Sequence, residues 1–501
     1  MRSWQRWRIG AVGLAVLVGA TACTDTGSEP ASAGPSTVRV MQFNIEYGGT
    51  LVDFDSVPSA VRAADADVVA LQEAYGNTCK VAKEVGWAYC DRRTQTISRY
   101  PLIAPTDPEA PHVLVAVAPG KVFGVINVHL PSAPYGPNRA AAGATETELI
   151  AGEKGRLKAI EPALESANGL QGDGVPVVVI GDFNTPSHLD WTGETEGLRD
   201  HVFPVQWPVT QSIQDAGLVD AYREVYPDPV GDQGLTWPAS RPKVGSYNPG
   251  PAGKPADRID MTFVSADIAV DSSEVVGEEG SSSTDVAVSP WPGDHRAVVT
   301  QLNIPLAESA PYVAPAQRLS ERGDIVEVNA SGTPTPTFLG FGASGGADGT
   351  GGVTGVVELD ADGSAVIDTS SIATGPVTLT ASDADGTEVA SGMFWVSEPG
   401  ADPQLSVGRG KYGVGDPIDV KWSGAPGNKW DWLGVYRRGA DPNVAYYKLW
   451  AYTGASIEGS MMIDDAFGGG GWPLPAGEYD VLLLEDDSYQ ELARAPFTVK
   501  R

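Results

Sequence analysis

The stretch Val177–Asn184, which reads VVVIGDFN, places a carboxylate and an amide at the end of an apolar run. Its first four residues are apolar and β-branched, which predicts a buried strand that stops at Gly181. Asp182 offers a hard oxygen ligand or a hydrogen-bond acceptor, and Asn184 offers a neutral donor to a phosphate oxygen. An ordinary strand that ends in an Asx turn has the same pattern. This stretch alone therefore leaves a catalytic role and a structural role open.

Two earlier strand-like runs end in the same kinds of side chain. Residues 38–43 lead into Asn44 and Glu46, which are expected to share one face, and residues 67–72 lead into Glu73. The complete set of acidic residues next to β-rich runs is Glu46, Glu73, Asp182, Asp260 and Asp294. Carboxylates gathered in one place repel one another, and a hard divalent cation relieves that repulsion. Because no zinc-like Cys/His pattern is present, Mg²⁺ or Mn²⁺ is the expected cofactor.

Two histidines accompany this acidic set. His129 ends an apolar run, and His295 precedes another. A single histidine in such a place is more often structural. Two histidines that join an acidic cluster suit general-base and phosphate-binding roles, since imidazole changes charge near neutral pH.

Length and composition bound the class of protein. A chain of 501 residues is too long for one core and predicts two to four domains. The 60 glycines and 39 prolines indicate many turns and much β structure. A formal net charge of −30 repels polyanions and anionic membranes at long range. A phosphate substrate stays possible, because bound divalent cations invert the local field.

The first 22 residues have the features of an export signal. A basic start is followed by the short apolar run 9–20, too short to serve as a stable membrane span. The segment 20–23, Ala-Thr-Ala-Cys, resembles a bacterial lipobox, which would make Cys23 the lipidated N-terminus and attach the protein to a membrane. Cleavage after Ala22 with free secretion is the alternative. Residues 23–36 are expected to be a flexible tether. The chain is thus expected outside the cytoplasm, as a cell-surface lipoprotein or a secreted protein.

Cys79 and Cys90 are the remaining cysteines. In an oxidising compartment a pair this close is expected to form a disulfide. A metal or redox pair is the alternative, but the spacing fits neither a CxxC redox site nor a zinc knuckle.

Seven short blocks resemble the signatures of the endonuclease/exonuclease/phosphatase superfamily and occur in its order. The superfamily includes deoxyribonuclease I, exonuclease III-type endonucleases and sphingomyelinases. The blocks are FNIE, VVALQE, TISRYP, VFGVINVHL, VVVIGDFN, DRID with FVS, and GDHR, in which Gly293 replaces the usual serine. Together they cover about residues 37–304. Any single block is weak evidence, whereas seven in order are strong.

The resemblance implies a fold and a set of residue roles. The fold is a four-layer α/β sandwich, in which two packed mixed β-sheets are flanked by helices. Metal ligands would be Glu73, with Glu46, Asn44 and Asp294 beside it. The catalytic set would be His295 as general base or phosphate ligand, Asp260 to orient it, Asp182 to position water or act as an acid, and Asn184 and His129 on phosphate oxygens. Asp257 rivals Asp260, but the family pattern selects Asp260.

Several other features have a structural interpretation that outweighs a functional one. The loop 186–191 could face substrate, but a structural loop with a packed Trp191 is favoured slightly. Segments 216–223 and 234–237 resemble a mainly structural part of the family. Basic residues could line a groove, although a solvated face is the favoured interpretation; they are Lys80, Lys83, Arg92, Arg93, Arg99, Arg139, Lys154, Arg156 and Lys158.

The character of the sequence changes after the last block. Residues 305–315 are predicted to be a linker, followed by two immunoglobulin-like β-sandwich domains at 316–398 and 403–501. Four tryptophans could form a sugar platform, but a place in the core is favoured; they are Trp430, Trp432, Trp450 and Trp472. Residues 305–501 contain no histidine, so this tail is expected to be dispensable for chemistry.

These patterns favour an extracytoplasmic, metal-dependent phosphoester hydrolase, first of all a phosphodiesterase or nuclease. A sphingomyelinase-type phospholipase C or an inositol-phosphate phosphatase is the alternative enzyme. The segment 278–290 is rich in Glu and Ser, which argues against an inserted aromatic hairpin. A surface adhesion protein with an inactive catalytic domain is the non-enzyme alternative, and the intact acidic and histidine positions argue against it. The partner is a phosphoester substrate, and no protein partner is identifiable.

Overall fold

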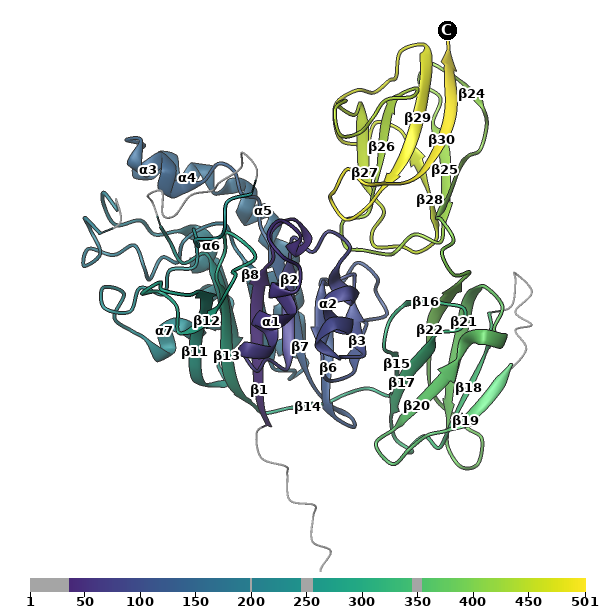
Figure 1. Ribbon diagram of the computed structural model, residues 1–501, viewed down its shortest axis with the longest axis horizontal. Coiled ribbons are helices and arrows are strands. Elements are labelled where there is room, and N and C mark those ends of the chain that lie inside the picture. The colour runs from purple at the N-terminus through teal and green to yellow at the C-terminus, as the bar shows by residue number, and fades with distance from the viewer. Residues whose placement is uncertain (1–35, 199–200, 245–255, 345–353) are drawn as a thin grey trace, which may run out of the picture. The chain divides into compact units, whose positions relative to one another are not determined.

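The computed structural model describes residues 36–198, 201–244, 256–344 and 354–501 (Figure 1). The predicted signal peptide, Cys23 and nearly all of the predicted tether lie outside these residues. Within the described ranges, no helix combines the length and the apolar character needed to cross a membrane.

The first part of the chain forms two seven-stranded sheets. The first sheet has the order β12-β11-β13-β1-β2-β4-β3, with bounds β1 Ser36–Asn44, β2 Val68–Gln72, β3 Tyr89–Asp91, β4 Thr96–Ser98, β11 Ala269–Glu278, β12 Val286–Val288 and β13 Ala297–Ile304. The second has the order β5-β6-β7-β8-β10-β9 with β14 paired to β7, and its bounds are β5 Leu102–Ile103, β6 His112–Ala118, β7 Lys121–His129, β8 Val177–Asp182, β9 Leu218–Asp220, β10 Asp260–Ser265 and β14 Ala307–Glu308.

Helices cover the outer faces of both sheets (Figure 1). The helical segments of this part are η1 Tyr47–Gly49, α1 Ser56–Ala63, α2 Thr78–Val85, α3 Gly136–Ala141, α4 Glu146–Gly152, α5 Lys154–Gly172, α6 Pro208–Asp215 and α7 Ala221–Val225, of which α1, α2, α5 and α6 cover the outer faces. Three apolar clusters define the layers. One lies between the sheets, one between the first sheet and α1 and α2, and one between the second sheet and α5 and α6. Burial on both faces explains why strands such as β8 are continuously apolar.

Strand pairing brings the functional strand ends to one edge. β1 and β2 are parallel, with Asn44 opposite Gln72. β7 and β8 are also parallel and pair His129 with Asp182, while antiparallel β10 pairs Asp260 with the same Asp182. The mixed pairing therefore gathers groups from distant parts of the sequence.

Gly181 permits the close approach of β7 and β8. Its φ is +151°, and a Cβ atom there would lie 1.9 Å from the carbonyl oxygen of Val128. Such an overlap is forbidden, so only glycine fits this position without moving the backbone.

The tail contains two pairs of sheets, each pair with a three-stranded and a five-stranded member around one apolar cluster. The first pair comprises β15 Tyr312–Pro315, β16 Leu319–Glu321, β17 Ile325–Ser331, β18 Phe338–Ala343, β19 Gly355–Glu358, β20 Ser364–Asp368, η2 Thr369–Ser371, β21 Gly375–Ser382 and β22 Glu388–Ser397. The second comprises β23 Gln404–Val407, β24 Lys411–Gly413, β25 Ile418–Ser423, β26 Trp432–Arg437, β27 Leu449–Tyr452, β28 Gly459–Ile463, β29 Gly477–Leu484 and β30 Glu491–Lys500. The immunoglobulin-like assignment stays a prediction.

Two expectations need correction. Residues 305–315 are not a free linker, because β14 pairs with β7 and β15 already pairs with β17. The basic residues are not all on a solvated face either. Arg93 and Arg156 are buried, where they pair with Asp91 and Glu153. A buried cation needs such a partner, so these two arginines hold loops together.

Candidate active site

His295 lies between three carboxylates at the edge where the strands end. Its Nδ1 is 3.0 Å from Oδ2 of Asp260, and its Nε2 is 3.8 Å from Oδ2 of Asp182 and 4.0 Å from Oδ1 of Asp294. The ring is 6% exposed. One nitrogen is thus held by a carboxylate, while the other faces the acidic cavity, which is the arrangement of an oriented general base.

Asp260 is itself fixed by its surroundings. Its backbone N–H donates to Oγ1 of Thr236, and its Oδ1 accepts a 2.5 Å hydrogen bond from Nε2 of Gln42. Gln42 lies on β1 and Asp260 on β10, so this contact joins the two sheets beneath the imidazole. Neither Thr236 nor Gln42 was predicted, because each lies far from Asp260 in sequence.

Burial of His295 and the charges around it shift its pKa in opposite directions. Burial acts to lower the pKa of His295, but the carboxylates of Asp260 and Asp182 outweigh it and raise that pKa well above 6.5. Burial also raises the pKa of Asp182 to about 6, an effect that His295 partly offsets. A proton is therefore readily shared between these two groups, which titrate as a pair.

Asp182 is the hub of the polar contacts. Its Oδ2 accepts hydrogen bonds of 3.1 Å from the side-chain amides of both Asn44 and Asn184. The side-chain amide of Asn184 also donates to the carbonyl oxygen of Leu130, and the backbone N–H of Asn184 donates to Oδ1 of Asp182. His129 lies at 3.6 Å from the same carboxylate. Because both amide hydrogens of Asn184 are engaged, Asn184 holds Asp182 here and has no hydrogen left for a phosphate oxygen.

Glu73 sits on a strained turn directly after β2. Its φ is +53°, and Glu46 and Asn184 have φ values of +46° and +52°. The left-handed region is costly for residues other than glycine and persists where the surroundings impose it, often at functional sites. The Glu73 carboxylate accepts from the amide of Asn44 at 3.3 Å and from the N–H of Tyr47 at 3.2 Å.

Glu46 has a partner that the sequence did not predict. Its two oxygens accept hydrogen bonds of 2.6 and 3.1 Å from Nε and Nη2 of Arg241. Burial raises the pKa of Glu46, and the guanidinium partly offsets this. The Arg241 guanidinium balances the charge of Glu46, so Glu46 attracts a cation less than a carboxylate without a cationic partner. Asp294, by contrast, is half-buried, and among the described residues its carboxylate has a long 3.4 Å contact from Nε1 of Trp237 and the 4.0 Å contact with His295.

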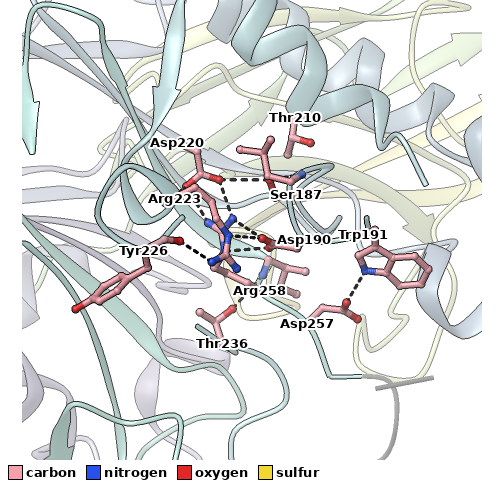
Figure 2. Close-up of polar contacts among 12 residues, drawn as sticks. Ser187, Asp190, Trp191, Thr210, Asp220, Arg223, Tyr226, Thr236, Asp257 and Arg258 are labelled. Carbon is pink, nitrogen blue, oxygen red and sulfur yellow. Dashed lines mark hydrogen bonds and ion pairs between the residues drawn. The ribbon is translucent and has the colours of Figure 1, made fainter. Parts of the chain in front are cut away.

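The alternative residue Asp257 has a structural role. Its Oδ1 accepts from Nε1 of Trp191 at 2.9 Å (Figure 2). The same oxygen lies 3.1 Å from Nε2 of His201, while Oδ2 accepts from the hydroxyl of Tyr135 at 3.0 Å. Trp191 is 1% exposed, in keeping with the packed loop that was favoured. Asp257 therefore locks loops together, and Asp260 is the residue that meets His295.

A buried ion network anchors the segment that leads into Asp260. Figure 2 shows Arg258 between Asp190 and Asp220, with Arg223 beside Asp190. Burial acts to raise the pKa of Asp190, but Arg258 and Arg223 outweigh it and lower that pKa. Removing one member of such a network leaves an unpaired buried charge, at a cost of about 3–5 kcal/mol. The network therefore fixes the position of β10.

The donor set fits a hard divalent cation. The Glu73 carboxylate, the side-chain oxygen of Asn44 and the Asp294 carboxylate are oxygen donors of the kind that Mg²⁺ and Mn²⁺ prefer. A second group of possible ligands, Asp182, Asp260 and His295, has one ligand atom each within 4.8 Å of the others. In that group Asp260 is already hydrogen-bonded to His295, which favours the first group as the metal position.

These side chains open onto one cavity of about 660 Å³. It is lined by seven of the predicted site residues, which are Glu46, Glu73, His129, Asp182, Asn184, Asp294 and His295. Asn44 and Asp260 lie directly behind it, in contact with Asp182 and His295. The cavity also has a wall that sequence reasoning missed, formed by Trp430, Tyr452, Asp486 and Asp487 of the tail. The only sequence features that pointed to this wall are the acidic turn at Asp486 and Asp487 and the tryptophans of the tail.

Cys79 and Cys90 form a disulfide with their Cα atoms 5.3 Å apart. The bond ties the start of α2 to β3.

Comparison with known proteins finds chains that are similar to this one. A protein of Caenorhabditis elegans is 30% identical over 256 residues, which span 45% of this chain and 78% of that protein. Among solved structures, an endonuclease/exonuclease/phosphatase from Beutenbergia cavernae is 16% identical, covers 72% of this chain and 99% of its own, and has a TM-score of 0.30. A mannosyl-6-phosphatase from Bacteroides thetaiotaomicron is 15% identical, covers 53% and 99%, and has a TM-score of 0.31.

The sequence profile of the Endonuclease/Exonuclease/phosphatase family matches residues 41–295, a range that contains every predicted metal and catalytic residue. The chain belongs to the endonuclease/exonuclease/phosphatase family.

Proposed function

We propose that this protein is a divalent-metal-dependent phosphodiesterase that works outside the cytoplasm. The observation that carries the proposal is the contact of His295 with Asp260, which leaves the second imidazole nitrogen facing Asp182 and the acidic cavity. This arrangement supplies a positioned base beside a set of hard oxygen ligands. The family supports a hydrolase of phosphoester bonds.

In this mechanism His295 takes a proton from water as the water oxygen attacks phosphorus. The bond from phosphorus to the leaving oxygen breaks opposite the new bond, and Asp182 provides the proton for that oxygen. The step uses the microstate in which the pair's proton lies on Asp182 rather than on His295, and burial, which raises the pKa of Asp182 to about 6, makes that microstate accessible. Asp260 keeps the imidazole oriented, and Asn44 and Asn184 hold the Asp182 carboxylate.

Glu73, Asn44 and Asp294 would hold the cation. When bound, it would neutralise charge on the phosphate oxygens that do not take part in bond breaking. His129 is proposed to contact a phosphate oxygen, since it borders the cavity and is 25% exposed at its side chain.

The direct test is hydrolysis of bis-4-nitrophenyl phosphate by the whole protein. EDTA should abolish turnover, and added Mg²⁺ or Mn²⁺ should restore it. Glu73→Gln should raise the Mg²⁺ concentration needed for half-maximal turnover, while Glu84→Gln, which changes an exposed glutamate on α2, serves as the control. Full activity in the chelator would overturn metal dependence.

Export and membrane attachment form a separate part of the proposal. They are supported by the basic start, the apolar run and the small residues before Cys23. Mature protein should partition with membranes and incorporate labelled palmitate, and Cys23→Ser should abolish both. A soluble, unlabelled form that begins at Cys23 would favour simple secretion.

A further inference from the structure

The tail takes part in building the strained turn that carries Glu73. Asp486, which is 1% exposed, accepts a 2.7 Å hydrogen bond from the N–H of Gly76, three residues after Glu73. The same carboxylate accepts from Nε2 of Gln95 at 3.2 and 3.1 Å. Gly76 has a φ of +81°, and a Cβ there would lie 2.5 Å from Oε1 of Glu485, so a side chain would strain the backbone and displace Glu485. Buried hydrogen bonds of this kind fix the turn against the tail.

A second set of contacts holds the neighbouring tail loop. The N–H of Lys429 donates to the carbonyl oxygen of Arg92 at 3.0 Å, and its Nζ donates to the carbonyl oxygen of Asn127 at 3.0 Å. Asn127 lies on β7, two residues before His129. The Lys429 Nζ therefore points into the protein, where it also lies 5.1 Å from the centre of the Trp430 ring, and Lys429 does not line the cavity.

These contacts present an aromatic and acidic wall to the cavity. The rings of Trp430 and Tyr452 lie 5.0 Å apart at an interplanar angle of 54°, so they form two sides of a corner. The Tyr452 hydroxyl donates to Oδ1 of Asp487 at 3.1 Å, and the N–H of Asp487 donates to the carbonyl oxygen of Trp430 at 2.9 Å. Trp432 is buried, as was favoured for all four tryptophans, but Trp430 is half-buried and borders the cavity.

The charge of the cavity narrows the substrate class. Six carboxylates line it, and no lysine or arginine of the described chain does so; the six are Glu46, Glu73, Asp182, Asp294, Asp486 and Asp487. A protein that binds a nucleic-acid strand places basic side chains along its phosphates, so this acidic lining argues against nucleic acid as the substrate. Aromatic faces next to a carboxylate attract a cation instead, by cation–π and charge interactions.

We propose that Trp430, Tyr452 and Asp487 form a subsite for a small organic cation that is esterified to the phosphate. The inference rests on the proposed phosphodiesterase activity and assigns its substrate class. The substrate is then a compact diester in which an ammonium group occupies the aromatic corner while the phosphate lies near His295. The tail is a part of the active site, contrary to the expectation that it is dispensable.

The test compares two substrates with the same leaving group and shape. One is 4-nitrophenyl phosphocholine, and the other is 4-nitrophenyl 3,3-dimethylbutyl phosphate, in which a carbon replaces the charged nitrogen. The whole protein should hydrolyse the cationic ester with a kcat/KM about tenfold higher. Trp430→Ala and Asp487→Asn should each bring that ratio close to one, and Trp430→Phe should restore most of it.

Matched controls are two exposed positions of the same sandwich, Tyr446→Ala and Asp465→Asn, which should keep the wild-type ratio. Hydrolysis of both esters at equal efficiency would overturn the subsite and leave the proposed function intact. A preference that survives both Trp430→Ala and Asp487→Asn would also overturn it. Failure to hydrolyse either ester or bis-4-nitrophenyl phosphate with Mg²⁺ or Mn²⁺ would overturn the proposed function, and the subsite with it.

Discussion

At the scale of single residues, the proposed chemistry depends on which partner each ionisable group has. His295 has a carboxylate on one nitrogen and an open cavity on the other, whereas Asp257 has all its contacts inside the protein. Motif order selected Asp260 over Asp257, and the contacts give the physical reason. The pairing of Glu46 with Arg241 could not be predicted, because 195 positions separate the two residues.

The protonation of His295 is a residue-scale prediction. In metal-free protein, its NMR titration should show a pKa well above 6.5, because Asp260 and Asp182 stabilise the imidazolium. The protonated His295 ring contributes to the free energy of unfolding. This contribution is complete below about pH 6.5 and is lost as pH rises through the raised His295 pKa. Asp260→Asn should move the His295 pKa downward, whereas Asp257→Asn should leave it nearly unchanged. A His295 pKa below 6.5 in the wild type would contradict these electrostatics.

At the scale of elements, the sequence predicts where strands form, but it does not predict which strands pair with one another. The runs at 38–43, 67–71 and 177–180 all contribute to strands, and the last is continuously apolar because β8 is buried on both faces. The pairing of Asp260 with Asp182 across β10 and β8 follows from sheet order, which no local pattern encodes. The short strand β14 also escaped prediction, because its two residues pair with β7 inside a stretch that reads as a linker.

Gly181 gives an element-scale prediction. Gly181→Ala should destabilise the β7–β8 pair by more than about 2 kcal/mol, because its Cβ would overlap the carbonyl oxygen of Val128. Gly169→Ala is the control, since it lies in α5 and has open space around its Cβ, and it should stabilise by about 0.5–1 kcal/mol. Thermal unfolding of both variants measures the difference. Equal midpoints for the two would show that the strands can separate at little cost.

The disulfide provides a second prediction for the same part of the fold. Its cysteines are 11 positions apart. In the chain-entropy model, closing a loop of that length stabilises the folded protein against unfolding by about 3 kcal/mol. The double change of Cys79 and Cys90 to serine should therefore lower the urea midpoint. Free thiols in the folded protein, detected by alkylation without reduction, would contradict the pairing.

At the scale of the whole molecule, the catalytic part and the tail share one cavity. The tryptophans of the tail were the main hint of this, because the tail lacks histidine and its acidic residues resemble turn signals. Asp486 looks like a turn residue, yet it is buried and bound to Gly76 and Gln95. Such contacts join residues about 400 positions apart, which periodicity and composition do not report.

Asp486 yields the prediction at this scale. Asp486→Ala should leave the N–H of Gly76 without its acceptor and loosen the Glu73 turn, so the Mg²⁺ concentration for half-maximal turnover should rise at least about fivefold. Asp465→Ala, an exposed change in the same sandwich, is the control. Isothermal titration with Mg²⁺ gives an independent readout of metal affinity. Unchanged affinity in Asp486→Ala would show that the turn holds its shape without the tail.

The central claim is that His295 and Asp260 act as one catalytic unit, and a double-mutant cycle tests it most directly. The measurement is turnover of bis-4-nitrophenyl phosphate at saturating Mg²⁺ by the wild type, His295→Ala, Asp260→Asn and the double variant. His295→Ala should lower turnover by about 10²–10⁴-fold, the usual worth of a positioned base. The double variant should lose far less than the product of the two single losses, because the residues act through one hydrogen bond. Near-normal turnover by His295→Ala, or losses that multiply, would contradict the account.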